Sequence, residues 1–77
     1  MIRYKDIDRD SNVFAYELGP DYIRIQFKTG KVYLYTNASA GVQNIKQMKD
    51  LAELGNGLNS FIMRNVKDRY ESIEKKL

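Results

Sequence analysis

The fold is decided between residues 22 and 36, which read YIRIQFKTGKVYLYT. In the first half of this stretch, Ile23, Ile25 and Phe27 alternate with polar residues, a period that is typical of a half-buried β-strand. A second run, rich in β-branched and aromatic residues, follows directly after Gly30. Two such runs joined by a short loop that contains glycine predict an antiparallel hairpin.

The length of the loop at Gly30 determines which side of the second strand faces the core. A two-residue loop, Thr29-Gly30, would place Tyr33 and Tyr35 on the polar face of the hairpin. A three-residue loop shifts the pairing by one residue and turns the strand over, so that Ile25 lies opposite Tyr33. Thr-Gly is not a favoured two-residue loop, whereas the three-residue loop requires glycine where Gly30 stands. We therefore expect the second register, with both tyrosines facing the core.

This register leaves an apolar strip, Val32 and Leu34, on the outward face of the hairpin. An apolar strip on an otherwise polar face favours a cover or a partner. The N-terminal segment, with Ile2, Tyr4 and Ile7, is one candidate cover. Val32 and Leu34 are therefore the candidate protein-interface residues, through which the chain would bind another protein or a second copy of itself.

Two helices are expected after the strands. Residues 39–54 repeat apolar side chains at helical spacing, with Ser39 as the N-cap and Gly55 at the end. A second helix is predicted from Leu58, because apolar residues recur every three or four positions up to Leu77.

The whole chain then predicts an α+β domain. Residues 13–18 alternate as a first strand and precede the hairpin. The predicted architecture is a three-stranded antiparallel β-meander followed by two α-helices packed on one sheet face. We expect residues 1–10 to be an N-terminal segment that can be flexible and residues 11–77 to be a single domain.

The composition excludes several classes of chemistry. The chain has 77 residues and contains neither cysteine nor histidine. Disulfides, the usual zinc sites, thiol nucleophiles and imidazole bases are therefore ruled out. No apolar run approaches the roughly 20 residues of a membrane span, and residues 1–5 hold no apolar signal core. We expect a cytoplasmic, non-catalytic protein with no cofactor and no metal.

One acidic stretch imitates a calcium loop. Asp6, Asp8, Asp10 and Asn12 alternate, and Glu17 follows at a suitable spacing. Ser11, however, occupies the position where the sharp turn of such a loop demands glycine. A solvated acidic segment is therefore the preferred interpretation.

The distribution of charge along the chain favours a ligand that carries phosphate groups. The net charge is only +3, but residues 22–49 contain five basic residues and no acidic one. Such a stretch attracts nucleic acid, although a plain solvated surface has the same composition. The candidate nucleic-acid-binding residues are Tyr22 for stacking, Arg24, Lys28 and Lys31 for phosphates, and Arg64 and Lys67 as an extension. RNA is the expected partner, and self-association or a protein partner is the alternative.

The order of several short motifs resembles the KTSC domain family. The motifs are Ser11-Asn12-Val13, Ile23-x-Ile25-x-Phe27, Gly30, Tyr33-x-Tyr35, Gly57-Leu58-Asn59-x-Phe61-Ile62 and Asn65-Val66-Lys67-x-x-Tyr70. The family is a short bacterial domain that occurs alone or at the C-terminus of some lysyl-tRNA synthetases. The resemblance implies a small α+β fold and an association with RNA, and it implies no catalytic residues.

This chain departs from the family pattern at two places. Asn37-Ala38 stands where the family often has a proline at the start of the first helix. Met63 stands where a polar residue is common.

Overall fold

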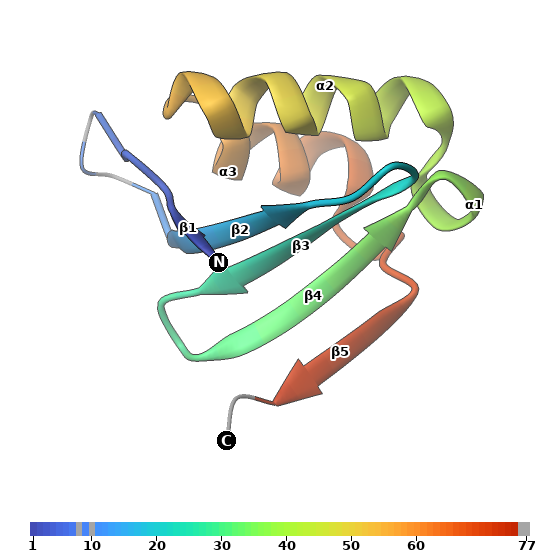
Figure 1. Cartoon of the computed structure of the whole chain (residues 1–77), viewed down its shortest axis with the longest axis horizontal. Coiled ribbons are helices and arrows are strands. Elements are labelled where there is room, and N and C mark those ends of the chain that lie inside the picture. Colours follow the sequence, from blue (N-terminus) through green and yellow to red (C-terminus); the bar gives the residue numbers. More distant parts are fainter. Residues whose placement is uncertain (8, 10, 76–77) are drawn as a thin grey trace.

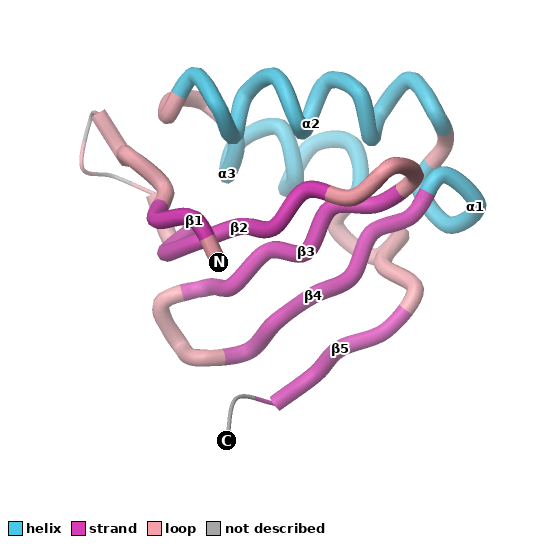
Figure 2. The backbone as a smooth tube through the Cα atoms, in the orientation of Figure 1, coloured by secondary structure: helices cyan, strands magenta, loops and turns pink. Residues whose placement is uncertain are grey.

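The protein folds as a five-stranded antiparallel sheet with its helices on one face (Figure 1). The computed structural model describes residues 1–7, 9 and 11–75. The strands are β1 (Ile2–Arg3), β2 (Val13–Leu18), β3 (Tyr22–Phe27), β4 (Lys31–Thr36) and β5 (Ser72–Lys75), and they lie side by side in sequence order. The helical segments are α1 (Asn37–Ala40), α2 (Val42–Leu54), α3 (Leu58–Phe61) and the π-helix η1 (Ile62–Val66) (Figure 2). The predicted α+β class is confirmed, with two strands more than the expected meander.

The register of the β3–β4 hairpin is the one that the loop chemistry predicts. Ile25 lies opposite Tyr33, and Ile23 lies opposite Tyr35. Gly30 has a φ of +97°, and its N–H donates to the carbonyl oxygen of Phe27 at 2.9 Å. The prediction is confirmed for the side chains as well, because Tyr35 is only 1% exposed.

The first predicted helix is divided into two pieces. Residues 37–40 form α1, and Gly41, with a φ of +95°, separates it from α2. The expected N-cap at Ser39 is wrong, because Thr36 is the N-cap of α1 and Ser39 is its reciprocal partner. The Thr36 hydroxyl accepts the Ser39 N–H, and the Ser39 hydroxyl accepts the Thr36 N–H, each at 3.0 Å. This capping box satisfies two N–H groups that a helix start otherwise leaves unpaired.

The second predicted helix is also shorter than its apolar spacing suggested. Its helical part ends at Val66, and residues 72–75 form strand β5 beside β4. The backbone N–H of Glu71 donates to the carbonyl oxygen of Leu34 at 2.6 Å, which begins this pairing. The correction has a tertiary cause, because β4 would otherwise present a row of unpaired backbone groups at the sheet edge. The last predicted position, Leu77, lies outside the described residues.

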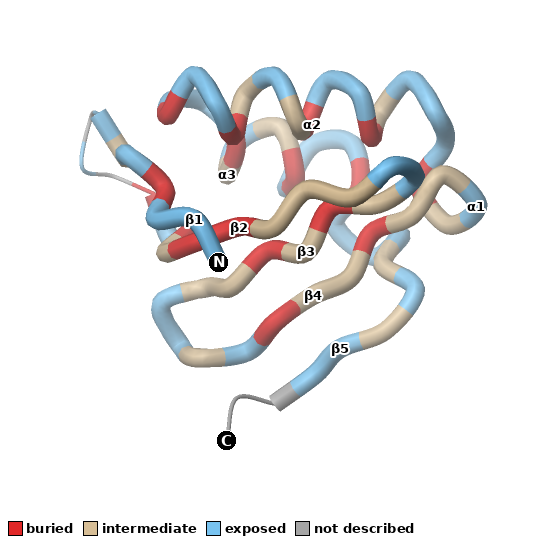
Figure 3. The backbone as a smooth tube through the Cα atoms, in the orientation of Figure 1, coloured by how far each residue is buried: buried red, intermediate tan, exposed pale blue. Residues whose placement is uncertain are grey.

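The core lies between the helices and the central strands (Figure 3). Strands β3 and β4 contribute their inward side chains, and each helix contributes one stripe. The largest side chains below 2% exposure are Tyr35, Ile23, Ile25, Ile45, Met48, Leu58, Ile62, Val13 and Val66. Searching the described part of the chain for a helix with the length and hydrophobicity of a membrane span finds none.

The N-terminal segment contributes to this core. Tyr4 is 3% exposed, and its hydroxyl accepts the backbone N–H of Leu58 at 3.3 Å. The N–H of Ile7 donates to the carbonyl oxygen of Gly55 at 2.9 Å. Strand β1 and these two contacts place the segment beside β2 and the start of α3, away from the outward strip on β4.

Candidate functional site

A pocket of about 350 Å³ opens between the β3–β4 hairpin and the α3–η1 segment. This volume lies at the lower end of the range of about 300–1,000 Å³ that small-molecule pockets show. The hairpin contributes aromatic rings and a lysine, and the helical segment contributes an amide, a thioether and a second lysine. The site therefore has a mixed lining, with aromatic, polar and charged side chains.

Aromatic rings form one wall of the pocket. The ring centroids of Phe27 and Tyr33 are 5.0 Å apart, and those of Tyr33 and Tyr70 are 5.1 Å apart, both edge to face. Tyr35 contacts Tyr70 in the same manner, at 6.4 Å. Each such pair is worth about 0.5–1.5 kcal/mol beyond the area that it buries, so the rings hold one another in place. The wall depends on the hairpin register and on the end of the helix at Val66, which brings Tyr70 back to the sheet.

The phenol of Tyr35 stays protonated in this wall. Burial is the main cause that raises its pKa above the ordinary value, and the neighbouring Tyr33, Tyr70 and Asp68 add to the effect. Tyr35 therefore contributes a buried, uncharged side chain to the wall.

The opposite wall comes from the helical segment. Asn59, Met63 and Lys67 follow one another at intervals of four residues, so they lie on one side of the segment, and Asp68 joins them. Residues 62–66 are π-helical, and the Nδ2 amide of Asn65 donates to the Phe61 carbonyl oxygen at 3.1 Å. Short π-helical turns are rare and occur frequently at functional sites.

The charged side chains of the pocket lining are two lysines and one carboxylate, Asp68. Lys28 and Lys67, both predicted to contact phosphate, line the pocket from opposite walls. The Lys28 ammonium lies 3.3 Å from the Asp6 carboxylate, so this charge is shared. Lys31 and Arg64, also predicted, are exposed and lie close by in the chain, but they do not line the pocket.

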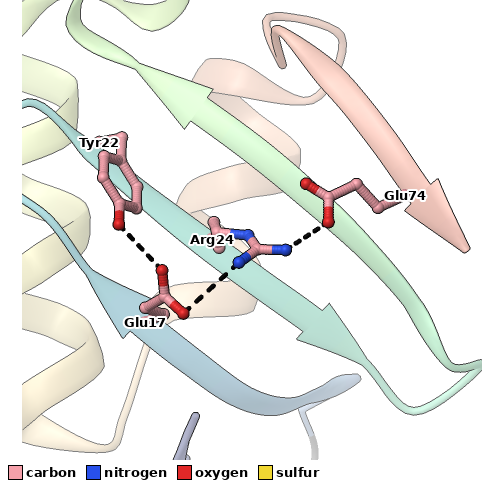
Figure 4. A network of polar contacts seen from close by, with 4 residues as sticks. All are labelled: Glu17, Tyr22, Arg24 and Glu74. Carbon is pink, nitrogen blue, oxygen red and sulfur yellow. Dashed lines mark hydrogen bonds and ion pairs between the residues drawn. The ribbon is translucent and has the colours of Figure 1, made fainter. Parts of the chain in front are cut away.

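Tyr22 and Arg24 lie on the opposite face of the sheet and form a polar network there (Figure 4). The Tyr22 hydroxyl donates to the Glu17 carboxylate at 2.9 Å, and this hydrogen bond raises the pKa of Tyr22. The Arg24 guanidinium lies 3.5 Å from Glu17 and also pairs with Glu74. The structure therefore separates these two predicted residues from Lys28 and Lys67 and gives each an acidic partner.

The face around this network is acidic. A hollow of about 500 Å³ is lined by Glu17, Asp21, Glu71 and Glu74, with Arg24 as its basic residue. Negative charge of this density repels phosphate. The pocket, with two lysines and one carboxylate, suits an anionic ligand better than this outer hollow, with four carboxylates and one arginine.

The outward strip has a cover other than the expected N-terminal segment. Val32 is 7% exposed and Leu34 is half-buried. Arg24 on β3 and Glu74 on β5 pair across β4, and in the pairing Arg24 lies opposite Leu34 and Glu74 opposite Val32 (Figure 4). This ion pair and its alkyl stems cover the strip, since long charged side chains readily lie over apolar surface.

The imitation of a calcium loop is only partly within the described residues. Asp8 and Asp10 lie outside them. Asp6 uses one carboxylate oxygen to accept the Ser11 N–H at 3.2 Å and the other to pair with Lys28. The described residues contain no cluster of three or more acidic side chains arranged to hold a metal ion.

Comparison with known proteins leaves the site to be interpreted from its own chemistry. No protein-family model matches this chain, and neither a curated protein nor a solved structure matches it. The resemblance to the KTSC domain therefore rests on the short motifs alone.

Sequence reasoning missed Asn59 and Tyr70 as pocket residues. The four-residue spacing of Asn59, Met63 and Lys67 was a readable signal for a shared face. Tyr70 gave no separate signal, because its spacing also fits a continuing helix.

Proposed function

We propose that this chain is a non-catalytic binding module for single-stranded RNA and that the pocket face is its contact surface. The observation that carries the proposal is the meeting of an aromatic wall with Lys28 and Lys67 at one pocket. Single-stranded bases stack on aromatic side chains at about 1–3 kcal/mol each, and lysines beside them contact the phosphates. Both kinds of group that such binding needs are present within one site.

The size of the pocket favours a single strand over a duplex. A cavity of about 350 Å³ is large enough for a base, and a base can enter it only when the base has left its stack. Sequence-specific RNA recognition uses loops and single strands for this reason. The proposed ligand is therefore an unpaired stretch with one base inserted.

The charge of the two faces supports a fixed orientation. The acidic hollow around Glu17 and Glu74 faces away from the pocket, so an approaching strand is attracted to one side and repelled from the other. The implied link between the KTSC domain and RNA points to the same class of partner.

The lining supports a binding role better than a catalytic one. Of the described pocket residues, Asp68 is the one carboxylate, and Lys28 and Lys67 are the other groups charged at neutral pH. Acid–base catalysis ordinarily pairs two groups whose pKa values are driven apart. Binding is the function that this set supports.

The test is a titration of a fluorescently labelled, unstructured RNA dodecamer at two salt concentrations. We expect the affinity to fall as the salt concentration rises. We expect Lys67→Ala to weaken binding several-fold and to reduce the slope of log affinity against log salt concentration by about one. Lys46→Ala is the matched control, because Lys46 is an exposed lysine of α2 that does not line the pocket. Absence of binding at low salt, or equal losses in the two variants, would refute the proposal.

A second candidate function is self-association or protein contact through the outer sheet face, which carries no helix (Figure 1). Val32 and Leu34 become available there only if the Arg24–Glu74 pair opens. We expect Arg24→Ala to increase self-association in sedimentation velocity. A monomer at high concentration in both proteins would exclude self-association.

A further inference from the structure

Two buried side-chain atoms among the described residues have no hydrogen-bond partner, Arg24 Nε and Asn59 Oδ1. The remaining guanidinium nitrogens of Arg24 pair with carboxylates, so its charge is satisfied. No comparable interaction accounts for the unpartnered Oδ1 atom of Asn59. A buried acceptor without a donor costs free energy, and native proteins retain few of them.

The place of Asn59 in the fold gives this atom a use. Asn59 lines the pocket from the helical segment, on the wall that faces the aromatic rings. Ligand pockets typically combine an apolar lining with a small number of polar groups that fix the orientation of the ligand. The terminal torsion of asparagine is broad, so rotation about it lets the amide of Asn59 adjust to a ligand in the cavity.

The other contacts of the site do not distinguish one base from another. Stacking on Tyr33 and Tyr70 tolerates every base, because every base has a π-face. Lys28 and Lys67 attract the phosphates, which are the same in every nucleotide. A preference among bases therefore has to come from a neutral polar side chain of the pocket. Asn12, Thr29 and Asn59 all line it, and of these three Asn59 is the one with a buried side-chain acceptor that lacks a partner.

We infer that Asn59 is the specificity-determining residue of the pocket, where its Oδ1 accepts a hydrogen bond from an N–H group on the edge of the inserted base. This inference rests on the proposed function, because it assumes that single-stranded RNA enters the pocket. It adds that the pocket selects a base rather than holding any base.

The experiment compares affinities for oligo(U), oligo(A) and oligo(C) of equal length. We expect the wild-type protein to prefer one of them by about tenfold and Asn59→Leu to reduce the differences to about twofold. Lys67→Ala lowers all three affinities by a similar factor and keeps the ranking. Asn65→Leu is the matched control, because Asn65 is an exposed asparagine of η1 outside the pocket, and it leaves both ranking and affinity unchanged.

The outcomes separate this inference from the proposed function. If the wild-type protein binds all three oligomers equally, or Asn59→Leu keeps the wild-type ranking, Asn59 does not select the base, although RNA binding stands. If the wild-type protein binds none of them, the proposed function fails first.

A second measurement uses the wild-type protein and does not depend on the folding of a variant. The side-chain amide resonance of Asn59 in an ¹⁵N–¹H spectrum should shift when the preferred oligomer is added. An unmoved Asn59 amide, together with shifts at Tyr33 and Tyr70, would overturn the inference.

Discussion

Replacing Gly55 by alanine should destabilise the protein through two separable effects. Gly55 has a φ of +83°, where an alanine costs about 1–2 kcal/mol. An added Cβ would also lie 2.6 Å from the Cβ of Lys5, and overpacking of this kind costs about 1–3 kcal/mol. We expect Gly55→Ala to lower the free energy of unfolding by about 2–5 kcal/mol, a large share of the roughly 4–12 kcal/mol of a domain this size.

Gly30→Ala is the matched control for the backbone effect. Its φ is +97° and no atom lies within 4 Å of the added Cβ, so only the strain of about 1–2 kcal/mol applies. Urea unfolding followed by far-ultraviolet circular dichroism gives both values. The difference between them measures how closely the N-terminal segment lies against Gly55.

A double variant isolates the contact. Lys5→Gly removes the side chain that the new Cβ meets, so Lys5→Gly/Gly55→Ala should recover the overpacking cost and keep the strain. If Gly55→Ala costs no more than Gly30→Ala, or if Lys5→Gly brings no recovery, the segment does not pack against Gly55 and the reasoning is refuted.

Two further predictions test the burial of Leu58 and the ionisation of Tyr35. Leu58→Ala should lower the free energy of unfolding, measured with urea, by about 2–5 kcal/mol, because Leu58 is 0% exposed. Leu54→Ala is the control and should change it by less than about 0.5 kcal/mol, because Leu54 is 59% exposed. Equal losses in the two variants would contradict the described core. Above pH 10, stability should fall as pH rises, because the unfolded chain releases its phenol protons before Tyr35, whose pKa burial raises in the folded state. Tyr35→Phe should reduce the loss of stability between pH 10 and pH 11 by about 1 kcal/mol, because the unfolded phenol is only partly ionised in this window. Tyr16 and Tyr22, whose pKa values are also raised, keep the remaining slope. An unchanged slope in urea titrations from pH 10 to 11 would show that Tyr35 ionises freely.

The hairpin could be predicted because its chemistry is local. Gly30 selects the loop, the loop selects the register, and the register decides that Tyr33 and Tyr35 face inward. The division of the first helix was also readable, because Thr36 and Ser39 have the spacing of a capping box and Gly41 follows. The cap was predicted at Ser39 because serine is a favoured N-cap residue and the apolar stripe begins shortly after it, at Val42.

The end of the second helix could not be predicted from local pattern. Tyr70 and Ile73 continue the helical spacing of Leu58 and Val66, yet both lie beyond the helix. The deciding interaction is the open edge of β4, which is more than thirty positions away in the chain. Local spacing carries no information about such a partner.

The residues of the candidate site were also predicted only in part. Lys28 and Lys67 were predicted for one ligand, and the fold brings them to one pocket. Tyr22 and Arg24 were assigned to the same surface, but their strand positions alternate with those of Ile23 and Ile25 and therefore face the other way. Tyr70 joins the pocket only because the helix ends early, at Val66.

Strands β1 and β5 come from the two ends of the chain and flank a meander whose members are neighbours along the chain. The meander can form through short loop closures, whereas β5 pairs with β4 only after the chain between Leu34 and Ser72 has closed into a loop. The order of assembly therefore runs from the middle of the chain outward. Because Tyr70 arrives with the last strand, the ability to hold a ligand appears at the final stage of folding and is the first property to be lost when the sheet frays at that edge.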